Sequence, residues 1–316
     1  MKIPFWALVG ISRPRFWLYT AGPFLIGIVS TDLSVLQWIW HFPFIVVVLG
    51  LLFFYFLFPA NLLIYGVNDI ADGDTDTYNL KKQWYETSLQ QQHHKALSRQ
   101  ILLWAIIPWI VISMLLYLWL LYYLSNWFTI IWNTLDLLMN TGRLFVRVGV
   151  SQRLILLVFW LLAYSYSSPP IRAKAIPFLD WLTNILYIVP GIFVYDIIVW
   201  IEYISWWYVI GWWMWCMAMH AYSAIPDIEP DQQAGIKTTA VYLWKKGTLL
   251  YCAILWIWAA FTISRPFPLF ALCAWAVYTF MIALSGHRPV IEMYKLFPWI
   301  NGVIWFVLFW LIVLSQ

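Results

Sequence analysis

The chain has 316 residues, of which 64% are hydrophobic and 10% are charged, with a mean hydropathy of +0.77. Soluble domains carry about 25% charged residues, so this composition excludes a soluble globular protein and indicates one that is surrounded by lipid. The net charge of +4 is too small to suggest a nucleic-acid partner. The three cysteines lie in apolar runs without a CxxC pair, which predicts buried thiols with no disulfide or metal role.

Apolar runs extend from one end of the chain to the other and predict a single membrane domain over 1–316. A hydrocarbon core about 30 Å thick requires roughly 20 apolar residues per helix. The runs lack the alternation of barrel strands, so we expect an all-α polytopic protein with about nine transmembrane helices. The expected spans are 16–37, 43–66, 101–124, 153–168, 181–201, 203–222, 248–264, 267–284 and 299–315.

The segment 125–152 does not fit this pattern of spans. It is apolar, but it is too short and too interrupted by polar residues to cross the bilayer twice. We therefore expect an external insertion, either an interfacial helix or a re-entrant piece. If it were a true span, the topology of everything downstream would be inverted.

Basic residues are distributed unevenly between the two faces that nine spans define. The N-terminus and the loops 67–100, 169–180, 223–247 and 285–298 fall on one face, which carries 14 of the 18 Lys and Arg. This bias places that face in the cytoplasm. The sequence thus predicts a protein of the cytoplasmic (inner) membrane with its N-terminus inside and its C-terminus outside.

The second span ends in an acidic cluster with the sequence NDIADGDTDTYN. Asn68, Asp72 and Asp76 are spaced by four, so they share one helix face, and Asp69 flanks them. Carboxylates stacked in this way repel one another unless a cation lies between them, and oxygen ligands suit Mg²⁺. An acidic loop that only aids solubility is the alternative. A calcium loop of the EF-hand type is excluded, because the required Gly and Glu are missing.

The sixth span ends in a second acidic cluster, DIEPD, in which Asp227 and Asp231 are again four apart and flank Glu229. Pro230 predicts that the helix breaks or restarts at this point. Both clusters close a helix that runs from outside to inside, so we expect them to face one central cavity under cytoplasmic cap loops.

Basic residues and a phenol accompany the acidic clusters on the same face. They are Arg13 before the first span, Lys81 and Lys82 in the first loop, and Tyr166, Arg172 and Lys174 in YSSPPIRAK. Each basic residue alone could be a snorkelling membrane anchor. Together with anionic clusters they suit a metal-bound diphosphate, whose oxygens the metal bridges and whose remaining charge Lys and Arg take up.

These motifs resemble those of the UbiA-type intramembrane prenyltransferases. NDIADGDTD is similar to the family motif NDxxDxxxD, DIEPD to its DxxxD motif, and YSSPPIRAK to the loop between its fourth and fifth spans. Together with SRPRFWLYTAGP and SAIPDIEPDQQAGIKTTA, they look most like the lycopene elongase branch.

The resemblance implies Mg²⁺-dependent transfer of a prenyl group from a prenyl diphosphate to a lipophilic acceptor. Dimethylallyl diphosphate and a lycopene-like carotenoid are the favoured pair, which corresponds to a C5 elongation. The implied metal ligands are Asn68, Asp69, Asp72, Asp76, Asp227 and Asp231. The implied diphosphate-binding residues are Arg13, Lys81, Lys82, Arg172 and Lys174, and the implied catalytic residues are Asp72, Asp76, Asp227, Asp231, Tyr166 and Lys174.

Two alternatives stay open. The acceptor could instead be an aromatic quinone precursor, a chlorophyllide or a glycerol lipid. The chain could also be an ion-coupled transporter, although transporter carboxylates usually lie in mid-membrane and not at helix ends.

Four other polar residues in or near the spans receive weaker predictions. Asp180 and Asn184 either orient the loop before them or merely cap a helix. Asp196 is expected to be solvated near the outer surface. His220 is expected to be a hydrogen-bonded core residue and not a cavity residue.

Overall fold

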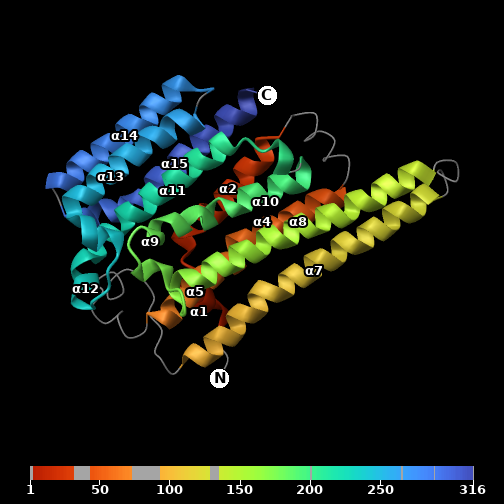
Figure 1. The fold of residues 1–316 in the computed structure, drawn as a ribbon, viewed down its shortest axis with the longest axis horizontal. Coiled ribbons are helices and arrows are strands. Elements are labelled where there is room, and N and C mark those ends of the chain that lie inside the picture. The colour runs from red at the N-terminus through yellow and green to blue at the C-terminus, as the bar shows by residue number, and fades with distance from the viewer. Residues whose placement is uncertain are drawn as a thin grey trace.

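The computed structural model describes residues 3–31, 43–72, 93–128, 135–199, 201–264, 266–287 and 289–315. Within these ranges the chain is helical and contains no strand. The helices pack in one elongated bundle, and the long helices α7 and α8 run along one side of it (Figure 1). The predicted all-α class is therefore confirmed.

The long helices are α2 (Leu18–Val29), α4 (Pro43–Leu57), α5 (Pro59–Ala71), α7 (His94–Phe128), α8 (Leu135–Ser167), α10 (Val189–Ile198), α11 (Trp206–Ala224), α13 (Thr239–Ile263), α14 (Pro268–His287) and α15 (Val290–Ser315). Three short helices accompany them, α1 (Phe5–Ile11), α9 (Leu179–Leu182) and α12 (Ile228–Gln233). Single turns of 3₁₀ helix connect several of these elements, including η4 (Ala173–Ala175) and η7 (Ile225–Asp227).

Each of the nine predicted spans contains helix in the structure. Six helical segments in the described ranges are long and apolar enough to cross a membrane. The chain is thus an integral membrane protein, and the number nine stays a prediction. The second span consists of two helices, because Pro59 at the first position of α5 interrupts the backbone hydrogen bonding that would join it to α4.

The described residues of the segment 125–152 extend the two neighbouring helices and form no separate helix, and the place of this segment outside the membrane stays a prediction. Residues up to 128 continue α7, and residues from 135 form the first half of α8. At 1.5 Å per residue, these helices of 35 and 33 residues are each about 50 Å long, more than the hydrocarbon core requires. The polar residues Asn126, Asp136 and Asn140 of the described part of this segment therefore lie on helix and do not mark breaks.

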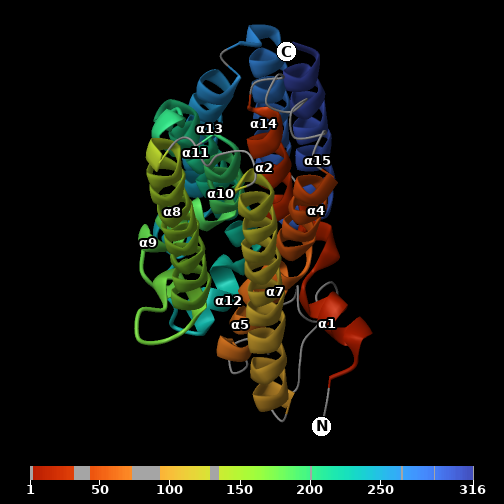
Figure 2. The ribbon, with the colours of Figure 1, turned by 90° about the vertical axis from the view of Figure 1, so that its right-hand side faces the viewer.

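The two ends of the bundle differ in what they carry. In both views α1, the end of α5 and α12 lie toward one end, and the C-terminal end of α15 lies toward the other (Figures 1 and 2). Both acidic motifs belong to the first of these ends, since one closes α5 and the other joins α11 to α12. The fold therefore gathers the sequence motifs at one end.

Candidate active site

A cavity of about 210 Å³ lies at the end of the bundle that carries the motifs. Its lining contains residues from both acidic motifs, Asn68 and Asp72 from the first and Asp227 and Asp231 from the second. The structure thus brings together residues that are about 160 positions apart in the chain. Among the other predicted site residues, the lining includes Arg13, Tyr166 and Lys174.

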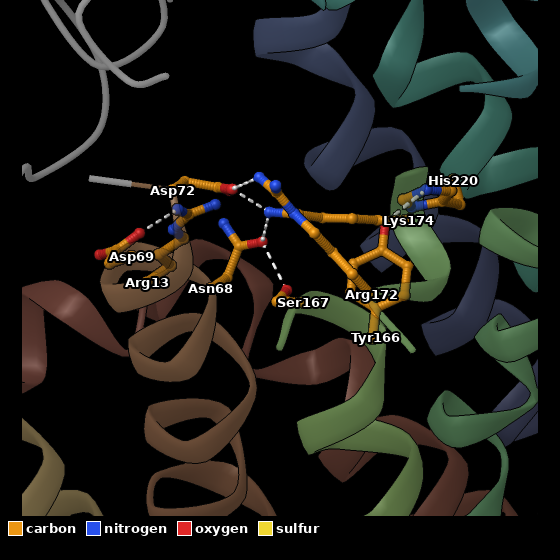
Figure 3. A network of polar contacts seen from close by, with 9 residues as sticks. All are labelled: Arg13, Asn68, Asp69, Asp72, Tyr166, Ser167, Arg172, Lys174 and His220. Carbon is orange, nitrogen blue, oxygen red and sulfur yellow. Dashed lines mark hydrogen bonds and ion pairs between the residues drawn. The ribbon is translucent and has the colours of Figure 1, made fainter. Parts of the chain in front are cut away.

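The first motif lies at the C-terminus of α5, where Asn68 and Asp72 project one turn apart (Figure 3). The Asn68 side-chain oxygen accepts hydrogen bonds from Ser167 Oγ at 2.8 Å and from Lys174 Nζ at 3.2 Å. The same ammonium group directly contacts Asp72 Oδ1, and Arg172 Nη2 lies 3.6 Å from that oxygen. Ion pairs and hydrogen bonds therefore hold the YSSPPIRAK loop against the first motif.

The contacts of Lys174 indicate that this motif can hold a metal ion. Its ammonium bridges the oxygens of Asn68 and Asp72, so both oxygens converge on one cation. A divalent cation that prefers oxygen ligands fits the same pair. In the described part of the chain, no group of three or more His, Cys, Asp or Glu is assembled as a complete metal site. Mg²⁺ commonly takes one or two carboxylates and completes its shell with waters and phosphate oxygens, so the residues fit it.

Asp69 has a different place from the one expected for a metal ligand. Its buried carboxylate pairs with Arg13 at 2.8 Å from Nη2 to Oδ1, and it does not belong to the cavity lining. A helix turns by about 100° per residue, so Asp69 cannot share the face of Asn68 and Asp72. The Arg13 guanidinium also lies 4.7 Å from the ring centroid of Tyr65. Asp69 therefore fixes a cation at the edge of the cavity.

The second motif lies where α11 ends and the chain restarts as α12. Asp227 closes the η7 turn and precedes α12, and Pro230 stands in the first turn of α12, where a missing N–H costs little. The predicted break at Pro230 is thus a helix restart just before it. Asp231 accepts a hydrogen bond from Thr238 Oγ1 at 3.3 Å.

Asp180 joins the loops that carry the two halves of the site. Its buried carboxylate accepts hydrogen bonds from Thr239 N at 2.9 Å, from Trp181 N at 3.0 Å and from the Thr239 hydroxyl. It therefore ties α9 to the start of α13, and its orienting role is the one the geometry supports. Asn184 instead donates to the carbonyls of Asp180 and Trp181 in α9, which precedes it in the chain.

Two arginines of the site have left-handed backbone conformations, Arg13 with φ of 52° and Arg172 with φ of 46°. Such a conformation costs a non-glycine residue roughly 1–3 kcal/mol and persists only where the surroundings enforce it. Here the ion pairs with Asp69 and Asp72 hold both side chains at the edge of the first motif.

Aromatic side chains, which the sequence did not single out, form much of the cavity wall. They are Phe16, Tyr19, Tyr65, Tyr187, Tyr294 and Phe297. Their rings contact one another, with 5.3 Å between the centroids of Phe16 and Tyr19 and 5.8 Å between those of Phe16 and Tyr65. The chain has 25 Trp, 19 Tyr and 21 Phe, so only their positions in the fold distinguish these six.

His220 and Asp196 also differ from expectation. His220 is half-buried and lines the cavity, where its Nε2 lies 2.9 Å from the hydroxyl of Tyr166. Asp196 is buried and not solvated, because α8 packs on α10 and Ser151 Oγ donates to its carboxylate at 2.7 Å. The predicted site residues Asp76, Lys81 and Lys82 lie outside the described residues.

The fold of the chain is similar to that of solved membrane proteins. The fold matches two structures of a UbiA homolog from Archaeoglobus fulgidus, one bound to DMAPP and Mg²⁺ and the other to GPP and Mg²⁺, each with a TM-score of 0.54 at 16% identity. The matches cover 95% and 97% of this chain and 99% of each solved chain. The architecture is therefore that of the UbiA-type intramembrane prenyltransferases.

Comparison with curated proteins narrows this class. The chain is 34% identical to lycopene elongase/hydratases from Haloarcula japonica and Haloferax volcanii, over 94% of its own length in both cases. It covers 87% and 85% of those two proteins. No family model matches the chain. By these relatives, the chain belongs to the lycopene elongase/hydratase family of UbiA-type prenyltransferases.

Proposed function

We propose that the chain transfers a prenyl group from a prenyl diphosphate to a carotenoid. Dimethylallyl diphosphate is the favoured donor and a lycopene-like C40 carotenoid the favoured acceptor. The observation that carries this proposal is the single cavity in which two carboxylate motifs, basic side chains and an aromatic wall meet. The names of the curated relatives and the ligands of the solved UbiA homolog support it.

The acidic residues of the cavity would hold Mg²⁺, namely Asn68 and Asp72 from α5 and Asp227 and Asp231 from the second motif, with Asp76 as a further ligand. Bound Mg²⁺ neutralises the diphosphate and favours its departure. We assign Asp69 a supporting role through Arg13, because its carboxylate is committed to that ion pair.

The basic residues would bind the diphosphate. Arg13, Arg172 and Lys174 lie at the first motif, and Lys81 and Lys82 follow it in the chain. Charge-assisted hydrogen bonds to phosphate oxygens are about twice as strong as neutral ones, so these residues stabilise the leaving group as its charge develops. Lys174 contributes by turning from Asp72 toward the incoming anion.

The aromatic wall would receive the prenyl tail and the allylic cation left when the C–O bond breaks. Aromatic faces stabilise cations within about 6 Å of the ring centroid. They also exclude water, which would otherwise capture the cation as an alcohol. A terminal double bond of the acceptor then attacks the cation and forms the new C–C bond.

Pigment analysis tests this proposal in a bacterium engineered to make lycopene. We expect the chain to produce C45 and C50 carotenoids, identified by chromatography with mass detection. Asp72→Ala and Asp227→Ala should abolish them, because each removes a carboxylate from one side of the cavity, and EDTA should stop turnover in isolated membranes.

Unchanged lycopene, with the protein present in the membrane, would contradict the carotenoid assignment. Aromatic quinone precursors and chlorophyllides would then be tried as acceptors in the same membranes. A dependence on a proton gradient instead of Mg²⁺ would contradict prenyl transfer itself and favour transport.

A further inference from the structure

A chain of buried hydrogen bonds crosses the bundle and ends at the wall of the cavity. Trp215 Nε1 donates to the hydroxyl of Tyr278 at 2.8 Å, and that hydroxyl donates to Asn301 Oδ1 at 2.7 Å. The amide nitrogen of Asn301 in turn donates to the hydroxyl of Tyr19 at 3.1 Å. All four side chains are buried, and they come from α11, α14, α15 and α2. Of the four, only Tyr19 belongs to the cavity lining.

The indole group gives this chain of hydrogen bonds a direction. An indole nitrogen can only donate, so the oxygen of Tyr278 accepts and its proton goes to Asn301. The amide oxygen of Asn301 is thereby the acceptor, and its NH₂ group is the donor to Tyr19. The Tyr19 hydroxyl must direct its own proton elsewhere, and no described residue accepts it. Because a buried donor without an acceptor is costly, we expect an acceptor inside the cavity.

Ring contacts hold the Tyr19 side chain at the cavity wall. It stacks on Phe16 with 5.3 Å between the centroids. Its edge-to-face contacts are with Tyr187 at 6.3 Å and with Trp215 at 6.5 Å. Packing therefore fixes the ring, while the hydrogen bonds fix which way its hydroxyl donates.

Prenyl transfer to an alkene creates a use for such a donor. The alkene π electrons form the new bond to the allylic carbon, and the acceptor is left with a tertiary cation. Loss of a neighbouring proton would give an alkene, whereas addition of water would give a tertiary alcohol. The curated relatives are named hydratases as well as elongases. Because bulk water would also capture the allylic cation, a water that adds only to the second cation must be held in one place.

We propose that Tyr19 holds this water, so that the acceptor is hydrated as it is elongated. The hydroxyl donates to the water oxygen, which keeps a lone pair with which to form the C–O bond to the tertiary cation. The departed diphosphate takes the proton that the resulting oxonium group loses, and the product is a tertiary alcohol. Trp215, Tyr278 and Asn301 are positioning residues, since they set the direction of the Tyr19 proton. This inference rests on the proposed function.

The test measures how the elongated product divides between alcohol and alkene, in membranes supplied with lycopene, Mg²⁺ and dimethylallyl diphosphate. Chromatography with mass detection gives the ratio. Tyr19→Phe should lower the ratio of alcohol to alkene about fivefold or more, the size of effect expected for one lost hydrogen bond. Tyr278→Phe should lower it in the same direction from outside the cavity, because Asn301 can then turn its amide and accept the Tyr19 proton.

Tyr55→Phe is the matched control, since the buried Tyr55 hydroxyl also accepts from an indole, that of Trp160 at 2.7 Å, and lies outside the cavity lining. A loss of packing alone would lower the total product and leave the ratio unchanged. An unchanged ratio in Tyr19→Phe, or in Tyr278→Phe if the first variant is absent from the membrane, overturns the inference.

The wild-type chain separates this inference from the proposed function. Elongated carotenoids that carry no hydroxyl group would overturn the role of Tyr19 and leave prenyl transfer standing. Release of diphosphate without any elongated carotenoid would contradict the proposed function itself, and the role of Tyr19 with it.

Discussion

Lys174 is the residue that we expect to take part in both metal binding and diphosphate binding. Its ammonium lies on the oxygens of Asn68 and Asp72, where it takes the place of a cation. An incoming metal ion competes with it for those oxygens, and an incoming diphosphate offers it a new partner. One side chain thus couples the two binding events.

Lys174→Met should therefore have opposite effects on the two ligands. The KM for dimethylallyl diphosphate should rise about tenfold or more, because a hydrogen bond to a charged group is worth about 1.5–3 kcal/mol. The Mg²⁺ concentration for half-maximal activity should fall, because the competing ammonium is gone. Titrating each ligand in membranes measures both effects, with exposed Lys295→Met as the control. An unchanged KM would remove Lys174 from the diphosphate site.

Asp180 is a second residue with an effect on the whole fold, because its hydrogen bonds join α9 to α13. In Asp180→Asn one carboxylate oxygen becomes an NH₂ group that faces donors of Thr239. Leaving a buried donor unsatisfied costs about 1–3 kcal/mol, so the melting temperature in detergent should fall. Exposed Glu292→Gln should leave it unchanged. A variant that melts like the wild type would show that other contacts hold the two loops.

At the scale of elements, the contact between α2 and α10 depends on two glycines. A Cβ atom on Gly191 would lie 2.7 Å from the carbonyl oxygen of Pro23, and one on Gly27 would lie 2.5 Å from the carbonyl oxygen of Gly191. Both obstacles are backbone atoms, which cannot move aside as a flexible side chain can. The two helices therefore approach as closely as their backbones allow.

Gly191→Ala should accordingly force these helices apart and destabilise the protein by about 1–3 kcal/mol, the usual cost of overpacking. Gly302→Ala in α15 is the matched control, since a Cβ there meets nothing within 4 Å. Its helix should be unchanged or slightly more stable. Thermal unfolding in detergent measures both variants. Equal melting temperatures would contradict a tight α2–α10 contact.

The same scale shows what the sequence could and could not predict. Lengths of apolar runs located helices, because lipid permits little else, and the number of crossings stays a prediction. The sequence of 125–152 did not predict the long helices α7 and α8. Polar residues on a helix that continues past the hydrocarbon core look, in the sequence, like the end of a helix. The spacing of four correctly put Asn68 and Asp72 together. Asp69, His220 and the aromatic wall depended on neighbours from distant helices, which one sequence does not reveal.

For the molecule as a whole, the position of the site predicts which way the protein lies in the membrane. Both motifs belong to the end of the bundle that carries α1 and α12, and the C-terminal end of α15 lies at the other end (Figure 2). The loops assigned to the first face carry 14 of the 18 Lys and Arg, which favours the cytoplasm. Prenyl diphosphates are anionic and cross lipid poorly, so a cytoplasmic supply requires the cavity to open on that side.

Reporter fusions test this orientation. We expect alkaline phosphatase fused after Ser315 to be active and green fluorescent protein at the same place to be dark, because only the phosphatase matures outside the cytoplasm. Truncation and fusion after Asp72 should give the reverse result, which controls for expression of both reporters. A fluorescent C-terminal fusion would mean that the chain crosses the bilayer an even number of times. That outcome would contradict the predicted orientation. The cavity that both acidic motifs line requires an even number of crossings between them, whereas the charge bias alone predicts which side of the membrane they face.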